Sequence, residues 1–237
     1  MAGHSKWANI KHKKAKEDAS RGKAFTKISK EITIAAKEGG DPSGNPRLRT
    51  LLEKAKHINM PGDNIKRAIQ KGTGELPGVH YEQHMYEGYG PGGMAVIVEV
   101  LTDNKNRAIA DMRHIFTKKG GNVAADGAVS WMFSLQGVIK LSECKKSEDE
   151  LLELLLDYDV INVENHEDMA IIHTGSKGLM EVKEVLEKNG IKVDHAEIEW
   201  VASTTVSPEG EDAEKAVEFL DALEELDDIQ NVYSNLA

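Results

Sequence analysis

Residues 80–103, HYEQHMYEGYGPGGMAVIVEVLTD, are the place where the hydrophobic pattern of the chain changes. Before them, apolar residues recur every three or four positions, which is typical of helices. Within them, the segments on either side of PGG follow the two-residue period of strands, and PGG itself is typical of a hairpin turn. The sequence therefore predicts a helical segment followed by one that contains a sheet.

The helical segment predicts three short helices. The first begins at Ser20 and ends at Gly39-Gly40. In the second, Asn45 is a candidate cap and Pro46 occupies the first position, and the third ends at Gly72. The apolar positions at helical spacing are Phe25, Ile28, Ile32, Ala35, Leu48, Leu51, Leu52, Ala55, Ile58, Ile65, Ala68 and Ile69. If these stripes meet in a bundle, the lysines must lie outside it.

Downstream of the hairpin, the pattern predicts a helix over 104–121 and then the order βαββαβ. Its elements are a strand at 133–142, a helix at 147–158, strands at 160–164 and 168–174, a helix at 178–189 and a strand at 191–201. This order is typical of the ferredoxin-like arrangement. A last helix and the strand IQNVYSNL follow Pro208, and they are expected to pair with the ββα unit across the inserted block.

We therefore predict an α+β fold with three domains. Residues 1–75 form a basic arm, over residues 1–20, and a helical bundle. Residues 76–130 and 204–237 form a split α+β domain, and residues 131–203 form the ferredoxin-like domain inserted into it.

Charge is divided unevenly along the chain, whose formal net charge is −10. Residues 1–72 contain 17 Lys and Arg against 7 Asp and Glu, whereas the remainder contains 13 against 33. A positive segment of this density attracts polyanions, so nucleic acid, or an acidic protein surface, is the natural partner, and nucleic acid is the one expected. The alternative is that the basic segment neutralises the chain's own acidic domains.

Several function classes find no support in the residues. The single cysteine, Cys144, excludes an internal disulfide and a multi-thiolate zinc site. Gly88, Gly90 and Gly93 spell G-x-G-x-x-G, but a strand follows them where a dinucleotide site needs a helix. His80 and His84 have metal-ligand spacing only on a helix, and they lie in a strand pattern. The other histidines are expected to be on the surface or hydrogen-bonded. We expect no catalytic residues, metal or cofactor.

The expected location of the protein is the cytoplasm. No apolar segment is long enough to cross a membrane, and no secretory signal is present. A basic, acid-poor start is also typical of organelle presequences, but Glu17, Asp18 and the helix pattern that follows them favour the cytoplasm.

The predicted nucleic-acid site is the arm and its continuation onto the bundle. Lysines can neutralise phosphates and release counterions, Trp7 can stack on a base, and His12 can stack or donate to phosphate. The candidate residues are Lys6, Trp7, Lys11, His12, Lys13, Lys14, Lys16, Arg21, Lys23, Lys27, Arg47 and Arg49, with Lys30 extending the same stripe. In the alternative interpretation, Trp7 only anchors the arm on the bundle and the lysines are solvated.

Four segments of the chain resemble the YebC/PmpR family: AGHSKWANIKHKKAKEDASRGKAFTKISKEI, GGDPSGNPRLR, NMPGDNIKRAI and YEGYGPGG. The resemblance covers essentially the full chain. It implies a three-domain α+β structure and a cytoplasmic, non-enzymatic regulator that binds DNA or acts at the ribosome, where it helps synthesis past difficult stretches such as prolines. Similar proteins usually have SGS where Asp126, Gly127 and Ala128 stand here, so no role of that loop is carried over.

The sequence thus predicts a nucleic-acid-binding regulator of gene expression, and two forms of it remain. The first is a DNA-binding transcriptional regulator of the YebC type. The second is a ribosome-associated translation factor that binds ribosomal or transfer RNA. Lysine binds phosphate without distinguishing the bases, and no helix-turn-helix stands out in the sequence. The residues therefore do not favour sequence-specific recognition of a DNA operator. The sequence does not indicate an oligomeric state.

Overall fold

The computed structural model describes residues 17–142, 144–166 and 169–237. These residues form an α+β structure that contains two separate four-stranded antiparallel sheets, which confirms the predicted fold class. The chain divides into two compact units, one formed by residues 1–129 and 205–237 and the other by residues 130–204. The boundaries predicted for three domains stay predictions.

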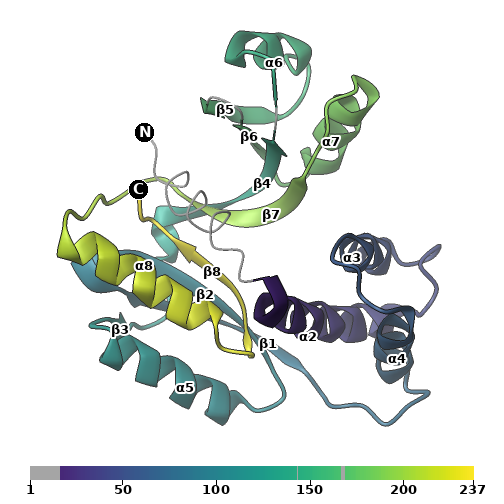
Figure 1. Cartoon of the computed structure of the whole chain (residues 1–237), viewed down its shortest axis with the longest axis vertical. Helices are drawn as coiled ribbons and strands as arrows, with labels where there is room; N and C mark the ends of the chain where they lie inside the picture. Colours follow the sequence, from purple (N-terminus) through teal and green to yellow (C-terminus); the bar gives the residue numbers. More distant parts are fainter. Residues whose placement is uncertain (1–16, 143, 167–168) are drawn as a thin grey trace. The chain divides into compact units, whose positions relative to one another are not determined.

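Three helices form the bundle of the first unit. They are α2 (Glu17–Ala35), which a short 3-10 turn (Ala36–Glu38) extends, α3 (Pro46–His57) and α4 (Gly62–Thr73). Helices α3 and α4 each pack mainly against α2, as Figure 1 shows. The predicted apolar stripes do meet inside, with Ile32, Leu48 and Ala55 fully buried. Helix α2 already includes Glu17, so its predicted start at Ser20 was too late.

Asn45 explains why α3 begins where it does. Its side-chain oxygen accepts a hydrogen bond from the backbone N–H of Leu48 at 3.0 Å, as expected of an N-cap residue. Its amide nitrogen also donates to the carbonyl oxygens of Ala35 and Gly39, at 2.8 and 2.9 Å. The buried Asn45 side chain therefore joins the end of the first helical segment to the start of α3.

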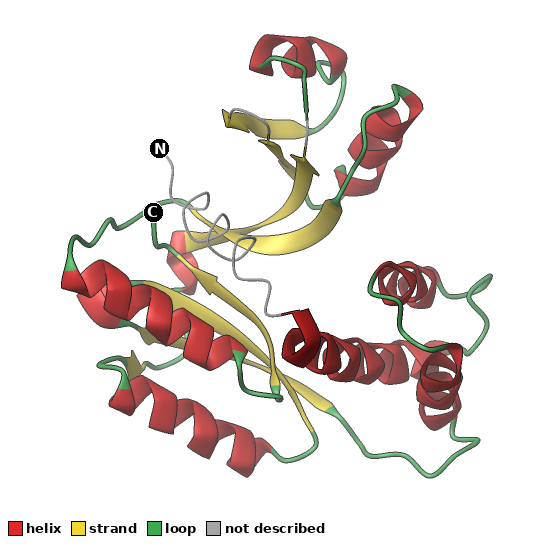
Figure 2. Ribbon diagram, in the orientation of Figure 1, coloured by secondary structure: helices red, strands yellow, loops and turns green. Residues whose placement is uncertain are grey.

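The sheet of the first unit combines strands from both ends of the chain. Its order is β3 (Asn122–Val123), β1 (Glu82–Tyr89), β2 (Ala95–Thr102) and β8 (Ile229–Ser234). Helices α5 (Lys105–Lys118) and α8 (Glu211–Glu224) pack on one face, where the rings of Phe116 and Phe219 meet edge to face at 4.9 Å. Figure 2 shows the two helices on this sheet. The pairing of β8 with β2 confirms that the two sequence halves join across the inserted block.

The glycines of GYGPGG belong to the hairpin between β1 and β2. They do not precede an α-helix, as the glycines of a dinucleotide-binding loop would. A Cβ atom at Gly88 would lie 2.4 Å from the Phe116 ring, and one at Gly90 would lie 3.0 Å from the Phe219 ring. Gly92 and Gly93 have φ values of 68° and 74°, which favour glycine. Close packing and a tight turn therefore account for this motif.

The second unit has the strand order β5 (Val160–His166), β6 (Met169–Gly175), β4 (Phe133–Ser142) and β7 (His195–Ala202). Helices α6 (Glu148–Leu154) and α7 (Leu179–Lys188) contribute Leu151, Val182 and Leu186 to its apolar cluster. This is the predicted ferredoxin-like arrangement. Helix α6 is shorter than predicted, and β7 begins four residues later than predicted.

Candidate nucleic-acid interface

Most of the predicted arm lies outside the described residues. This applies to Lys6, Trp7, Lys11, His12, Lys13, Lys14 and Lys16. Arg21 lies in the first turns of α2, but its side chain is not described. The role of these residues in binding stays a prediction.

Lys23 and Lys27, in the next turns of α2, contact the C-terminal end of α8. The Lys23 ammonium group donates to the carbonyl oxygen of Glu225 at 3.1 Å, and that of Lys27 donates to the carbonyl oxygens of Glu224 and Gln230 at 3.4 Å each. The last carbonyls of a helix lack helical partners and carry partial negative charge, so they attract cations. The two lysines thus already have partners within the chain, and their binding to nucleic acid stays a prediction.

Lys30 continues the same row one turn further, and it corrects the expectation that the lysines lie outside. Its side chain is buried and forms an ion pair of 2.9 Å with Asp228, which is the last residue of the turn between α8 and β8. The ammonium group also donates to the carbonyl oxygens of Asp227 at 2.8 Å and Leu101 at 3.3 Å. A buried cation needs such partners, because transfer out of water is costly for an isolated charge.

Arg107 completes this ionic group from α5. Its guanidinium donates to Asp228 at 2.8 and 3.1 Å and to Asp103 at 2.7 Å. Burial tends to raise the pKa of Asp228, but the hydrogen bonds from Lys30 and Arg107 outweigh it and hold the pKa below its usual value. Asp228 is therefore a carboxylate at neutral pH, bound from both sides by cations.

Arg47 and Arg49 lie at the start of α3, as predicted, and both are exposed. Arg49 donates to the carbonyl oxygens of Pro42 and Ser43, at 3.2 Å each, and so helps to hold the preceding turn. Arg47 extends from the first turn of α3 without a hydrogen bond of this kind to the described loop. The turn thus fixes the backbone from which both guanidinium groups project.

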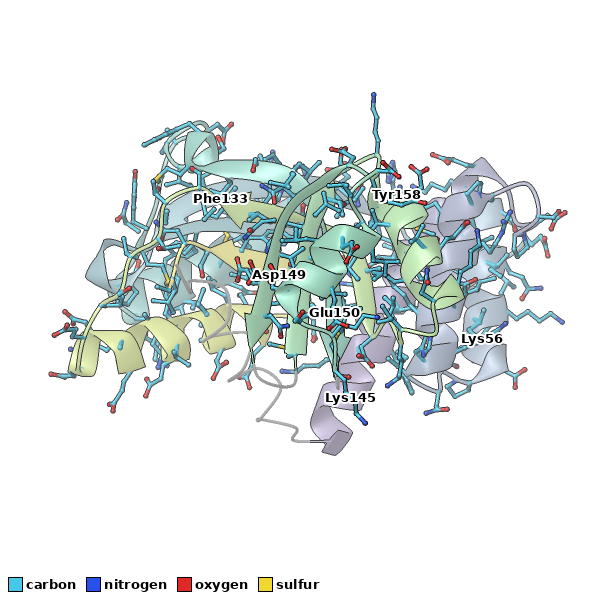
Figure 3. All side chains as sticks on the ribbon, turned by 90° about the horizontal axis from the view of Figure 1, so that it is seen from above. Lys56, Phe133, Lys145, Asp149, Glu150 and Tyr158 are labelled. Atoms are coloured by element: carbon cyan, nitrogen blue, oxygen red, sulfur yellow. The ribbon has the colours of Figure 1, made fainter. Side chains whose placement is uncertain are left out.

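The bundle exposes further basic side chains that the sequence analysis did not single out. They are Lys37, Lys56, Lys66, Arg67 and Lys71, and Figure 3 labels Lys56 on α3. Their signal was available, because these positions lie between the apolar positions of their helices. The acidic residues Glu38, Glu53 and Asp63 are also exposed, so this surface is mixed in sign.

The histidines do not assemble a metal site in the described part of the chain. No group of three or more histidine, cysteine, aspartate or glutamate side chains there is placed to hold a metal ion. His84 contacts Glu82 at 3.2 Å, and His195 contacts Glu199 at 2.6 Å. His173 is an exception to the prediction, because it is buried and neither ring nitrogen has a hydrogen-bond partner among the described residues.

Burial lowers the pKa of His173. The loss of solvent disfavours the charged ring, and this effect exceeds the opposing influence of Glu164 and Glu199. Glu164 lies 3.6 Å from the Nε2 atom. His173 is therefore a neutral ring at pH 7, on the face of the second sheet opposite its helices.

Two models of known protein domains match this chain. The chain matches the model of the TACO1/YebC protein N-terminal domain over residues 5–75 and that of the TACO1/YebC second and third domain over residues 81–236. The chain belongs to the TACO1/YebC family. The resemblance found in the sequence motifs is thereby confirmed.

Among TACO1/YebC relatives, a protein from Nitrosococcus oceani is 52% identical over 237 residues, which is 99% of this chain and 95% of the relative. A protein from Persephonella marina is 54% identical over 240 residues, with 99% and 95% coverage. Both are named "Probable transcriptional regulatory protein". A crystal structure of a conserved hypothetical protein from Aquifex aeolicus is similar with a TM-score of 0.86 and 49% identity, covering 98% of this chain and 96% of that one.

Among the described residues of this TACO1/YebC chain, no helix combines the length and the apolar character that crossing a membrane requires.

Proposed function

We propose that this protein is a non-enzymatic, cytoplasmic regulator of gene expression that binds nucleic acid through its arm and helical bundle, and that it acts as a DNA-binding transcriptional regulator. The observation that carries the proposal is the division of charge, with 17 basic against 7 acidic residues in positions 1–72. The names of the TACO1/YebC relatives support the same role. No step of the proposal requires a cofactor or metal.

The mode of binding follows from the chemistry of the basic residues. The arm supplies lysines, which bind phosphate as point charges and carry little information about base sequence. A helix-turn-helix reader normally packs its two helices together, whereas α3 and α4 each pack mainly on α2. We therefore expect contacts with the phosphate backbone to dominate affinity. The same chemistry suits folded RNA, which makes a ribosome-associated translation factor the second candidate.

The arm is tested by the affinity of the full chain for duplex DNA, measured by fluorescence anisotropy over a range of salt concentrations. The variant replaces Lys11, Lys13, Lys14 and Lys16 with alanine. If all four contact phosphate, the log-log salt slope decreases in magnitude by about 3.6, since each phosphate contact contributes about 0.9. The melting temperature should change little if these lysines serve binding, because charges that do not contact the rest of the chain add little to stability.

A matched control removes the same charge elsewhere. The control variant replaces the exposed residues Lys118, Lys145, Lys177 and Lys188 with alanine. Its log-log salt slope should be nearly that of the wild type. Equal slopes for the wild type and the arm variant would refute the proposal. A collapse of the melting temperature in the arm variant would instead support the interpretation that the arm neutralises the acidic domains.

Two experiments in cells distinguish the candidate functions. Crosslinking of the protein to chromosomal DNA, lost in the arm variant, supports transcription. Co-sedimentation with ribosomes, lost in the same variant and without DNA crosslinking, supports the translation factor.

A further inference from the structure

The bundle and the rest of the first unit have separate apolar cores. The bundle cluster draws its members from residues 25–69, and the cluster of the sheet with α5 and α8 draws its members from residues 86–236. Among the described residues, no member is common to both clusters. Contacts other than a shared apolar core must therefore fix the position of α2 on α8.

The contacts between α2 and the end of α8 are polar and ionic. Lys23, Lys27 and Lys30 follow one face of α2 at helical spacing and donate to the chain between Glu224 and Gln230. The side chain of Gln230 also donates to Glu31. Figure 1 shows the start of α2 beside the end of α8. We call this set of contacts the α2–α8 junction.

Asp228 is the centre of this junction. One carboxylate oxygen accepts from Lys30 of the bundle at 2.9 Å, and the other accepts from Arg107 of α5 at 2.8 Å. A cavity of about 490 Å³ lies beside these groups, lined in part by Thr26, Tyr81 and Asp111. Because no side chain of the described residues fills this side of the junction, close packing among them cannot substitute for the ion pairs there.

Ion pairs of this kind define geometry more than they add stability. The desolvation of the charges offsets much of their attraction, but displacement of either partner leaves a buried charge unpaired, which is strongly unfavourable. A bundle held by Asp228 therefore has one preferred orientation. Without Asp228, Lys30 retains no anionic partner among these contacts, only the carbonyl oxygens of Asp227 and Leu101 and the Tyr81 ring, whose centroid lies 5.8 Å from the ammonium group. The bundle can then sample other orientations.

We propose that Asp228 is a positioning residue for nucleic-acid binding: through Lys30 and Arg107 it fixes the helical bundle in the orientation that is competent to bind. The inference rests on the proposed function. A fixed orientation matters because the rest of the chain has 33 acidic against 13 basic residues, which repel a phosphate backbone in unsuitable orientations. The apparent affinity falls in proportion to the fraction of molecules in the competent orientation.

The sign of the effect of Asp228→Asn separates this proposal from simple electrostatics. The substitution removes a negative charge, so charge alone predicts binding to a polyanion that is equal or tighter. Positioning predicts weaker binding, by about tenfold if one molecule in ten keeps the competent orientation. The salt slope should not change, since Asp228 contacts no phosphate.

Asp227→Asn is the matched control. Asp227 is the neighbouring residue, its side chain is exposed, and its carbonyl oxygen rather than its carboxylate contacts Lys30. The Asp227→Asn variant loses the same negative charge and should bind duplex DNA as tightly as the wild type or more tightly.

The Lys30→Gln variant removes the other partner of the Lys30–Asp228 ion pair. It should show the same loss of affinity as Asp228→Asn, with an unchanged salt slope. A decrease of about 0.9 in the magnitude of the slope would instead identify Lys30 as a phosphate contact and overturn the proposal.

A distance measurement gives a readout that a loss of stability alone would not change. Spin labels are attached at Lys56→Cys on α3 and Lys118→Cys on α5, both exposed positions, in a Cys144→Ala background. Double electron–electron resonance should show a broader distribution of the distance between the two labels in Asp228→Asn than in Asp227→Asn. Circular dichroism establishes that each variant is folded, and Lys30→Gln takes the place of Asp228→Asn if the latter is not.

The outcomes separate the two proposals. If the arm variant loses affinity but Asp228→Asn binds as tightly as Asp227→Asn, only the positioning role is overturned. If the arm variant binds like the wild type, the proposed function fails irrespective of Asp228.

Discussion

Substitution of Gly88 by alanine tests whether the hairpin glycines serve packing. A Cβ atom at Gly88 would lie 2.4 Å from the Cε1 atom of Phe116 and 2.7 Å from the carbonyl oxygen of Asn122. Ordinary contacts between carbon atoms are about 3.5–4.0 Å, so the Phe116 ring would have to move by about 1 Å. Asn122 lies in β3, which pairs with β1 at Gly88 and Tyr89, so its backbone cannot move without breaking that pairing.

The magnitude follows from these two clashes. Overpacking a filled core typically costs about 1–3 kcal/mol, and the fixed backbone oxygen places Gly88→Ala at about 3 kcal/mol. A displaced Phe116 ring would also weaken its edge-to-face contact with Phe219, which is of a kind worth about 0.5–1.5 kcal/mol. For a structure of this size, a loss of about 3 kcal/mol lowers the melting temperature by about 6–12 °C.

The assay is urea unfolding followed by circular dichroism, with thermal unfolding alongside it. Gly22→Ala is the matched control, because Gly22 is exposed within α2 and no atom lies within 4 Å of the position that a Cβ atom would take there. Alanine there should stabilise the protein by about 0.5–1 kcal/mol, since glycine is unfavourable inside a helix. A loss below 1 kcal/mol for Gly88→Ala would show that packing does not explain the motif.

Three further predictions concern the other parts of the molecule. His173→Leu should remove part of the loss of stability on acidification. The unfolded histidine has the higher pKa, near 6.5, so it binds more protons than the folded one, and stability falls as the pH falls below 6.5. The prediction would be contradicted if the urea midpoint of the wild type did not change between pH 7 and 5. It would also be contradicted if the midpoint of the variant changed with pH as much as that of the wild type. Ser147→Ala should destabilise α6 by about 1 kcal/mol, because Ser147 and Glu150 cap its start reciprocally, and faster amide exchange in α6 would report it. Arg47→Gln should reduce the magnitude of the salt slope on duplex DNA by about 0.9 without a change in melting temperature; an unchanged slope would remove Arg47 from the interface.

Local pattern was enough to predict most of the elements. The cap at Asn45 and the hairpin at PGG depend on residues within a few positions of one another, and both are present. The two-residue strand β3 was missed because two residues carry no periodicity. Its position depends on Gly88 and Phe116, which are distant in sequence.

The candidate site was only partly accessible to sequence reasoning. The basic character of the first 72 residues is a property of composition, and the sequence shows it directly. Periodicity identifies which face of α2 is apolar, but it does not show which charged residues meet a second element. Lys30 therefore looked like part of an exposed stripe, although it is buried against Asp228.

The sequence by itself determined the order of the elements, the α+β class, the family and the division of charge, because each depends on local pattern or composition. Only the tertiary structure decided the surroundings of Lys23, Lys27, Lys30 and His173. The partners of the three lysines near the end of α8 lie about 200 residues further along the chain, and the surroundings of His173 depend on strands that pair across a sheet. The electrostatic environment of a side chain is set by such long-range neighbours, and no local pattern records them.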